Sequence, residues 1–248
     1  MNFHRATLET CVNAEGAVVV IDVIRAFTSA AYAFGAGAAV ITLVSTIDEA
    51  FALRQQNPDA LIMGEDGGKP IPGFDFSNSP THYLDIDLSG HSLIQRTTHG
   101  TQGVVRSVRA DTLLTAGFPC ARATAARLRA LQPQQVTFVI TGWEGDGLWG
   151  DEDMACADYL EALLRGLDPD PAPYLDRVRH SPTGLLFADP TVTHFSPDDL
   201  PLCVALDRFD FAMQVERQDG LLHMTPVAAT QGGEESADGD CAKPRFMA

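Results

Sequence analysis

Residues 17–21 read Ala17-Val18-Val19-Val20-Ile21, an almost wholly apolar run that is rich in β-branched side chains. Such a run is typical of a strand inside a parallel sheet that helices cover on both faces. Asp22 follows the run directly, and the Ala-rich segment at 30–37 is expected to be a helix that ends at glycines. The sequence therefore predicts a buried strand with a carboxylate at its carboxyl end.

Further strands and helices are expected to alternate along the chain. The apolar runs predict strands at 39–44, 60–63, 92–98, 112–116 and 135–141, whereas helices are expected to open at 45–50 and to cover 121–131 and 154–164. Two late strands are expected at 202–206 and 220–224. This order predicts an α/β fold with a layered, largely parallel sheet and helices on both faces.

The chain of 248 residues is long enough for one large domain. We expect a single α/β domain over residues 1–230, with two lobes divided near the Pro-rich segment 165–200 as the alternative, and a flexible acidic tail at 231–248. No apolar stretch reaches the length of a membrane span, and the start of the chain leads into no signal-peptide core. The five scattered cysteines lack metal-knuckle spacing, so a cytoplasmic protein with free thiols is expected.

The formal net charge is −16, which argues against nucleic acid and anionic membranes as partners. An anionic substrate would need a metal cation or arginines in the pocket to reverse the field locally. Only two lysines occur, and one of them, Lys69, lies in a Gly-rich block.

That block runs from Gly64 to Pro80 and follows the apolar run at 60–63 directly. Loops of this composition bring oxygen ligands and backbone N–H groups together, which suits a metal ion and an anion; an ordinary surface turn is the alternative. Polar clusters also follow the expected strands at residue 22, at 97–99 and at 142 onward. Because ligands of open α/β sheets bind outside the carboxyl ends of the strands, a site is expected there.

Several well-known phosphate sites are excluded by the spacing of residues. Haloacid-dehalogenase phosphatases need a second Asp two positions after the first, where this chain has Ile24. A dinucleotide fingerprint, a P-loop and a nucleophile elbow are also missing. What remains is a set of carboxylates with arginine, threonine and Gly-rich turns, which suits Mg²⁺ and a phosphate.

Each candidate residue has a plainer interpretation that the sequence leaves open. In this plainer interpretation, Asp22 and Arg25 form a local ion pair, and the acidic residues at 152–153 only complement a helix dipole. Asn78 would form an Asx turn, Thr97-Thr98 would be strand residues, and His99 would be an ordinary loop histidine.

Five motifs occur in a fixed order: Ile21-Asp22-Val23-Ile24-Arg25-Ala26-x-Thr28, Gly64-Glu65-x-Gly67-Gly68, Gly73-Phe74-Asp75-x-x-Asn78-Ser79-Pro80, Thr97-Thr98-x-Gly100-Thr101 and Glu152-Asp153-x-x-Cys156-Ala157. Together they resemble the 2-phosphosulfolactate phosphatase family over residues 1–228. The resemblance implies a family-specific α/β fold and a Mg²⁺-dependent hydrolase. Its reaction would convert (2R)-2-phospho-3-sulfolactate to sulfolactate and phosphate, a step toward coenzyme M.

The resemblance also implies roles for individual residues, with Asp22 or a water on the metal as the attacking group, and it is compatible with a homodimer. The expected catalytic residues are Asp22, Arg25, Glu65 and Asp75; the expected substrate-binding residues are Gly67, Gly68, Lys69, Asn78, Ser79, Thr98, His99, Gly100 and Thr101; the expected metal ligands are Asp22, Glu152 and Asp153.

Two positions depart from the family pattern. Asp66 stands where the family has Arg, and His99 stands where it has Asn. The loss of one positive charge and the gain of a negative one favour two alternatives, namely a phosphatase of the same fold that acts on another small phosphate monoester, or a homologue that binds anions but has lost catalysis. Retention of the other acids argues for an enzyme.

Overall fold

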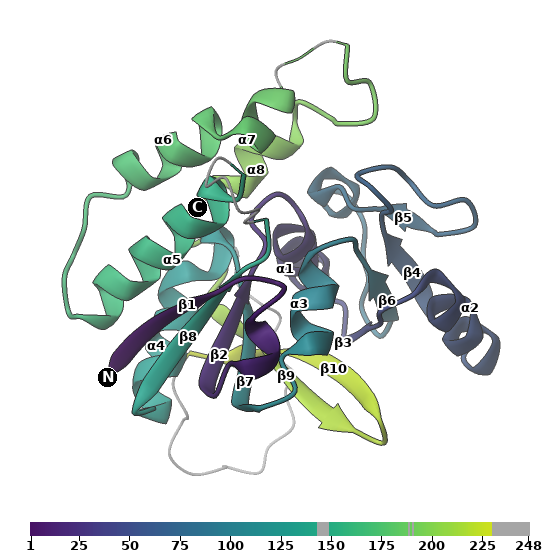
Figure 1. Ribbon diagram of the computed structural model, residues 1–248. Coiled ribbons are helices and arrows are strands. Elements are labelled where there is room, and N and C mark those ends of the chain that lie inside the picture. Colours follow the sequence, from purple (N-terminus) through teal and green to yellow (C-terminus); the bar gives the residue numbers. More distant parts are fainter. Residues whose placement is uncertain (143–148, 188, 190, 230–248) are drawn as a thin grey trace.

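The computed structural model describes residues 1–142, 149–187, 189 and 191–229, so the tail expected at 231–248 lies outside the described residues. The described chain forms one ten-stranded sheet in the order β1-β8-β2-β7-β9-β10-β3-β6-β4-β5 (Figure 1). The strands are β1 (Asn2–Ala6), β2 (Gly16–Ile21), β3 (Val40–Leu43), β4 (Leu61–Gly64), β5 (Phe76–Ser77), β6 (Ser92–Arg96), β7 (Ala110–Ala116), β8 (Gln135–Ile140), β9 (Phe211–Gln218) and β10 (Leu221–Ala228).

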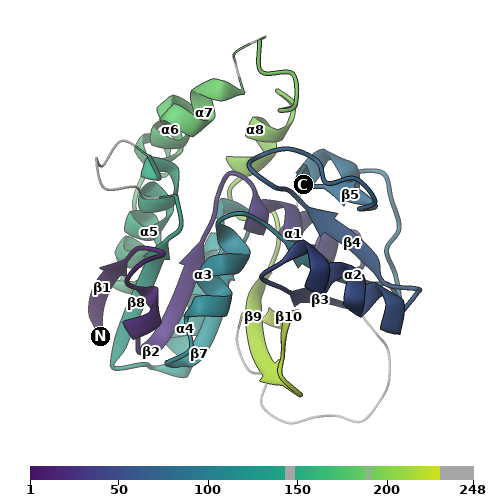
Figure 2. The same ribbon diagram turned by 45° about the vertical axis from the view of Figure 1, so that its right-hand side comes forward.

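The sheet consists of two parallel halves joined by an antiparallel hairpin. The first half is β1-β8-β2-β7 and the second is β3-β6-β4-β5, each with parallel neighbours throughout. The hairpin β9–β10 pairs antiparallel with β7 on one side and with β3 on the other. Figure 2 shows the hairpin between the two halves. The α/β class and the largely parallel sheet are confirmed, whereas a single functional domain stays a prediction.

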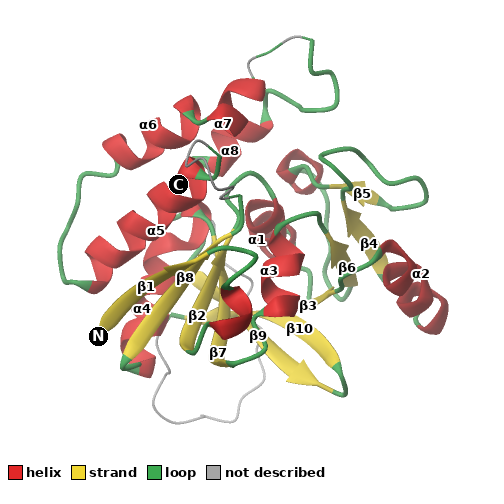
Figure 3. Cartoon of the chain, viewed as in Figure 1, coloured by secondary structure: helices red, strands yellow, loops and turns green. Residues whose placement is uncertain are grey.

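Helices cover both faces of the first half of the sheet (Figure 3). The helices of the described chain are α1 (Ala26–Gly35), α2 (Ile47–Gln56), α3 (Gly100–Arg106), α4 (Ala121–Leu131), α5 (Asp151–Leu164), α6 (Ala172–His180), α7 (Pro182–Leu186) and α8 (Asp199–Cys203), with 3₁₀ turns at Cys11–Asn13, Pro80–Tyr83 and Phe118–Cys120. Of these, α2 packs on β4 and β6 of the second half. Side chains of the central strand β2 alternate, so that Val18 and Val20 join one core with α1, and Val19 and Ile21 join another with α4 and α5. Burial on both faces explains the unbroken apolar run.

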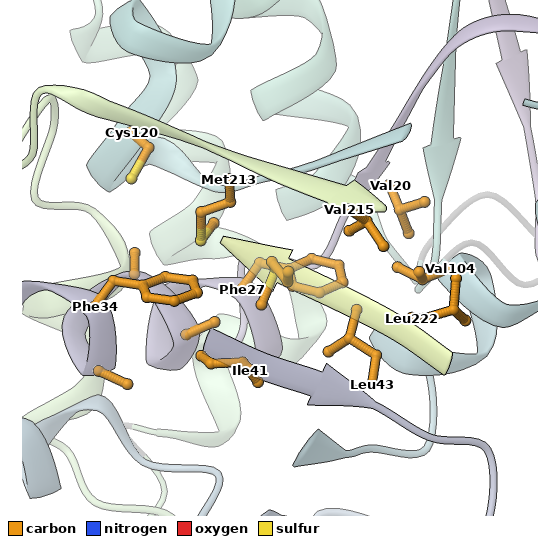
Figure 4. Packing of buried hydrophobic residues seen from close by; sticks show 14 of the residues in the cluster. Val20, Phe27, Phe34, Ile41, Leu43, Val104, Cys120, Met213, Val215 and Leu222 are labelled. Carbon is orange, nitrogen blue, oxygen red and sulfur yellow. The ribbon is translucent and has the colours of Figure 1, made fainter. Parts of the chain in front are cut away.

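The core around α1 connects the two halves of the sheet. Phe27 and Phe34 of α1 pack with Val20 of the first half and with Ile41 of the second (Figure 4). Hairpin residues such as Met213 complete this core. The two halves therefore share one continuous hydrophobic cluster, which fixes the carboxyl ends of their strands relative to one another.

The prediction of a late strand at 202–206 is wrong, because this segment begins within α8 and continues as a turn. A short apolar run without clear periodicity does not distinguish a buried helix from a strand, and Cys203 is buried in the helical form. The expected strand at 220–224 corresponds to β10. Within the described part of the chain, no helix is both long enough and apolar enough to cross a bilayer.

Candidate active site

The carboxyl ends of β2, β4, β6 and β8 converge on one cavity of about 350 Å³, so residues from both halves of the sheet line it. The polar lining residues are Asp22, Arg25, Glu65, Asn78, His99, Thr141, Glu152, Asp153 and Thr183, and the glycine and apolar lining residues are Ile24, Gly67, Gly68, Gly142, Trp149, Leu186, Phe187 and Phe195. The structure thus brings together four of the carboxylates that the sequence singled out, from elements far apart in the chain.

Asp22 lies at the end of β2 and at the start of α1. Its Oδ1 accepts a hydrogen bond from the backbone N–H of Ala26 at 2.9 Å, and the residue is buried. Burial raises the pKa of Asp22 to about 6, and repulsion from the carboxylates of Glu65 and Glu152 acts in the same direction. A cation in the cavity would relieve the cost of this buried negative charge.

Asp153, in the first turn of α5, holds two backbone segments of the cavity in place. Its Oδ1 accepts from the N–H of Val23 at 2.8 Å, and its Oδ2 accepts from the N–H of Gly142 at 3.0 Å. The hydroxyl of Thr141 lies 3.2 Å from the same Oδ2. Burial, with repulsion from Asp22, raises the pKa of Asp153 well above its usual range. Both of its oxygens are therefore engaged by protein donors, which does not favour the expected role as a metal ligand.

Two buried oxygen atoms of the lining residues have no hydrogen-bond partner among the residues that the structure describes. They are Oε2 of Glu152 and Oδ1 of Asn78. The Asx-turn interpretation of Asn78 is wrong, because an Asx turn would engage this Oδ1. Glu152 lies in the first turn of α5 but is buried in the cavity wall, so complementing the helix dipole is not its only role. Unsatisfied buried oxygens of this kind are suitable ligands for a hard cation.

Arg25 does not pair with Asp22, so the local ion-pair interpretation is wrong. Its Nη1 instead lies 2.7 Å from Oδ2 of Asp199, and both side chains are buried. The guanidinium carbon lies 5.3 Å from the ring centre of Phe187 and 4.9 Å from that of Phe195. Arg25 is accordingly held from three sides while it lines the cavity.

Glu65 fastens the Gly-rich loop to the end of β6. Its Oε2 accepts from the N–H of Gly68 at 2.6 Å, and its Oε1 accepts from the N–H of Thr98 at 2.5 Å. The hydroxyl of Thr98 donates to Glu65 and accepts from the N–H of Gly67 at 2.8 Å. Both glycine N–H groups, expected to bind an anion, are therefore already used inside the protein. The positive φ angles of Gly67 and Gly68, +56° and +79°, explain why glycine occupies both positions.

Six predicted site residues do not line the cavity, namely Lys69, Asp75, Ser79, Thr98, Gly100 and Thr101. Asp75 accepts two hydrogen bonds from Arg54 and one from the N–H of Ile62, which fixes the loop rather than a substrate. The hydroxyl of Ser79 donates to Asp199 at 2.5 Å, and Thr101 exchanges hydrogen bonds with Thr97. Lys69 makes paired backbone hydrogen bonds with Asp66 and is not among the lining residues. The sequence placed these residues in the site because they neighbour residues that do line it.

The two departures from the family pattern have different surroundings. Oδ1 of Asp66 lies 2.7 Å from Nη1 of Arg96, which neutralises the negative charge outside the cavity. His99 lines the cavity, and it follows β6 rather than belonging to it, as Thr97 and Thr98 also do. The strand interpretation of the two threonines is therefore wrong.

Sequence reasoning missed the aromatic and aliphatic residues that close the cavity, above all Phe187 and Phe195. It also missed Asp199. These residues come from the Pro-rich segment, where hydrophobic periodicity is weak and no motif marks a site. The one available signal for Asp199 was its place at the start of a late segment, 199–210, that resembles the C-terminal part of the family.

The residues present fit a magnesium ion of low carboxylate count. Within the described ranges no three of the His, Cys, Asp and Glu side chains stand as a ready metal cluster. Mg²⁺, however, takes one or two carboxylates and keeps several waters, unlike zinc. Asp22 and Glu152 with the carbonyl of Asn78 would meet that need, and the unpaired oxygens of the last two support it.

Comparison with known proteins gives one consistent family. The model of the family described as 2-phosphosulpholactate phosphatase matches residues 3–181. A protein of Bacillus subtilis named probable 2-phosphosulfolactate phosphatase is 38% identical over 203 residues, which is 82% of this chain and 87% of the relative. Proteins of the same name from Synechococcus and Carboxydothermus hydrogenoformans are 39% and 41% identical. Those alignments cover 62% and 61% of this chain, and the chain spans 63% and 62% of the two relatives.

Proposed function

The chain belongs to the 2-phosphosulfolactate phosphatase family, and we propose that it hydrolyses 2-phospho-3-sulfolactate to sulfolactate and phosphate. The observation that carries the proposal is that Asp22, Arg25 and Glu152 line one cavity, and that Oε2 of Glu152 has no hydrogen-bond partner in the described part of the chain. Buried carboxylates beside an arginine are an arrangement that suits a phosphate ester bound together with a cation.

The proposal includes Mg²⁺, held by Asp22 and Glu152 with help from Asn78. The ion would supply positive charge for the phosphoryl oxygens. The charges that line the cavity support this ion, because four carboxyl groups and only one arginine are among the described lining residues. The backbone N–H groups of Gly67 and Gly68 already donate to Thr98 and Glu65. An anionic ester would be repelled from such a wall without a cation.

The chain's own residues would bind and orient the ester. Arg25 would bind a phosphate or sulfonate oxygen through its charged N–H groups. Asp153 fixes the backbone at Val23 and so the direction of the preceding Asp22. His99 is the one imidazole among the described lining residues, and in this proposal it would give a proton to the departing oxygen.

A second substrate class is favoured by the apolar part of the wall. Trp149, Leu186 and Phe187 line the cavity, and 2-phosphosulfolactate has no apolar group to cover them. A phosphate monoester with a carbon side chain would bury that surface. This alternative is a phosphatase of the same fold and the same catalytic groups, with another small ester as its substrate.

The test is phosphate release from a panel of esters with the full chain. It includes 2-phosphosulfolactate, 2-phospho-carboxylates with and without an alkyl side chain, and an aryl phosphate. The proposal expects kcat/KM for 2-phosphosulfolactate to exceed that for every other ester by at least about tenfold, since the sulfonate adds a charge-assisted contact. Preference for an alkyl ester would favour the second class, and no turnover of any ester would favour a binding protein without catalysis.

The proposal also includes the cellular location of the protein. A cytoplasmic location agrees with the four buried free cysteines of the described chain, which a reducing compartment would keep as thiols. A place in coenzyme M biosynthesis and a homodimer both stay predictions.

A further inference from the structure

We infer that Asp199 is a positioning residue, which holds the guanidinium of Arg25 in the orientation that binds the substrate's anionic group. The inference rests on the proposed function. Asp199 begins the short helix α8, lies outside the residues that the family model matches, and is completely buried. It does not line the cavity, so it would act only through the residues that it contacts.

Both oxygens of Asp199 are engaged by residues of the site. Oδ2 lies 2.7 Å from Nη1 of Arg25, and Oδ1 accepts from the hydroxyl of Ser79 at 2.5 Å. Ser79 directly follows Asn78, which lines the cavity. One buried carboxylate thereby ties the Gly-rich block and the loop after β2 to the C-terminal part of the chain.

The surroundings of Arg25 leave its guanidinium little freedom. The rings of Phe187 and Phe195 stack on each other with centres 4.8 Å apart, and the guanidinium lies against both. Across the described ranges, Asp199 supplies the single hydrogen bond to this guanidinium. The N–H groups that Asp199 does not use are therefore left for an anion in the cavity that Arg25 lines.

Such an arrangement differs from a pair that only stabilises the fold. A buried ion pair contributes little net stability, because desolvation offsets the attraction between its charges. Holding an arginine in its binding geometry beforehand, in contrast, removes the ordering cost at the moment when the anion binds. The value of Asp199 would then be found in anion affinity and would depend on the presence of Arg25.

The test measures binding of inorganic phosphate by titration calorimetry in the presence of Mg²⁺, which needs no turnover. Asp199→Asn keeps the shape of the side chain but removes its charge. We expect this variant to bind phosphate at least tenfold more weakly than the wild type. In an Arg25→Ala background the same substitution is expected to change the affinity by less than twofold, because the residue through which it acts is gone.

A purely structural role would give different results. Wild-type affinity in Asp199→Asn would overturn the inference, and so would a loss of equal size in the Arg25→Ala background or the absence of phosphate binding by the wild type. If Asp199→Asn does not fold, Ser79→Ala tests the same link, with a loss of at least twofold that disappears without Arg25. A wild type that binds phosphate but hydrolyses no ester would contradict the proposed function while leaving the role of Asp199 intact.

Discussion

Gly100 lies so close to Asp22 that a methyl group on its α-carbon would stand 2.7 Å from Oδ2 of that carboxylate. The same methyl group would lie 2.7 Å from Cβ of Ala26, at the start of α1. The start of α3, which follows β6 of the second half of the sheet, therefore contacts the carboxylate that follows β2 in the first half. Position 100 therefore requires glycine, because the side chains of Asp22 and Ala26 leave no room for a Cβ atom.

Gly100→Ala is accordingly expected to displace the Asp22 carboxylate and to lower kcat/KM by about 10–100-fold, as misplacement of a reacting group does. Steady-state phosphate release measures the effect. Gly117→Ala is the matched control, because its methyl group would lie 3.3 Å from the nearest side-chain atom and the residue does not line the cavity. Equal activity in the two variants would contradict the close contact.

Asp22→Asn is expected to stabilise the metal-free protein at alkaline pH. The folded pKa of about 6 lies above the ordinary value of 3.8, so the free energy of unfolding falls as pH rises from about 4 to about 6, and the full penalty remains above pH 6. With EDTA present, the variant should exceed the wild type by about 2–3 kcal/mol in free energy of unfolding at pH 8, but by only about 0.5 kcal/mol at pH 4.

Urea denaturation at the two pH values measures this difference. Asp85→Asn is the control, since Asp85 is exposed and outside the cavity. A wild type more stable than Asp22→Asn at pH 8 without metal would show that the buried carboxylate is not destabilising.

Asp75→Asn is expected to leave kcat/KM within about twofold of the wild-type value, because Asp75 is bound to Arg54 and Ile62 away from the cavity. The melting temperature should fall by several degrees, since removal of hydrogen bonds to a charged group costs about 1–3 kcal/mol. Arg54→Ala should reproduce both effects. A large loss of kcat in Asp75→Asn, but not in Arg54→Ala, would restore Asp75 to the catalytic groups that the sequence predicts.

Glu65→Gln separates a structural role from a catalytic one. The amide retains one acceptor oxygen, so either the N–H of Gly68 or that of Thr98 loses its partner, at a cost of about 1–3 kcal/mol. We expect lower stability and lower activity together, and Thr98→Val should show a milder form of both. Abolished turnover with an unchanged melting temperature would instead identify Glu65 as a group that acts on the substrate.

The sequence was sufficient to predict the α/β class and the edge at which the site lies. Strands such as β2 can be recognised in the sequence, because burial on both faces requires an unbroken apolar run. Asp22 and Glu152 could be chosen because they neighbour the ends of recognisable strands or helices. The antiparallel hairpin in the middle of the sheet could not be placed, since pairing between distant strands leaves no local pattern.

Contacts of individual side chains were beyond the sequence for the same reason. Arg25 is three residues from Asp22 in the chain, which suggested a pair, but its partner is 174 residues away. Asp153 and Glu152 are adjacent and look equivalent in the sequence, yet the first accepts from two backbone N–H groups, whereas Oε2 of the second has no partner among the described residues. Only the fold distinguishes a residue that holds the site together from one that is free to bind.

The most direct test of a metal-assisted phosphatase centred on Asp22 is the rate of phosphate release from 2-phosphosulfolactate, measured for the wild type and Asp22→Asn with Mg²⁺ and with EDTA. The account predicts turnover by the wild type with Mg²⁺ alone, and a loss of at least about 10³-fold in kcat on removal of the ion or the carboxylate, because both supply charge to the transition state. Turnover that persists in EDTA, or in folded Asp22→Asn, would contradict it.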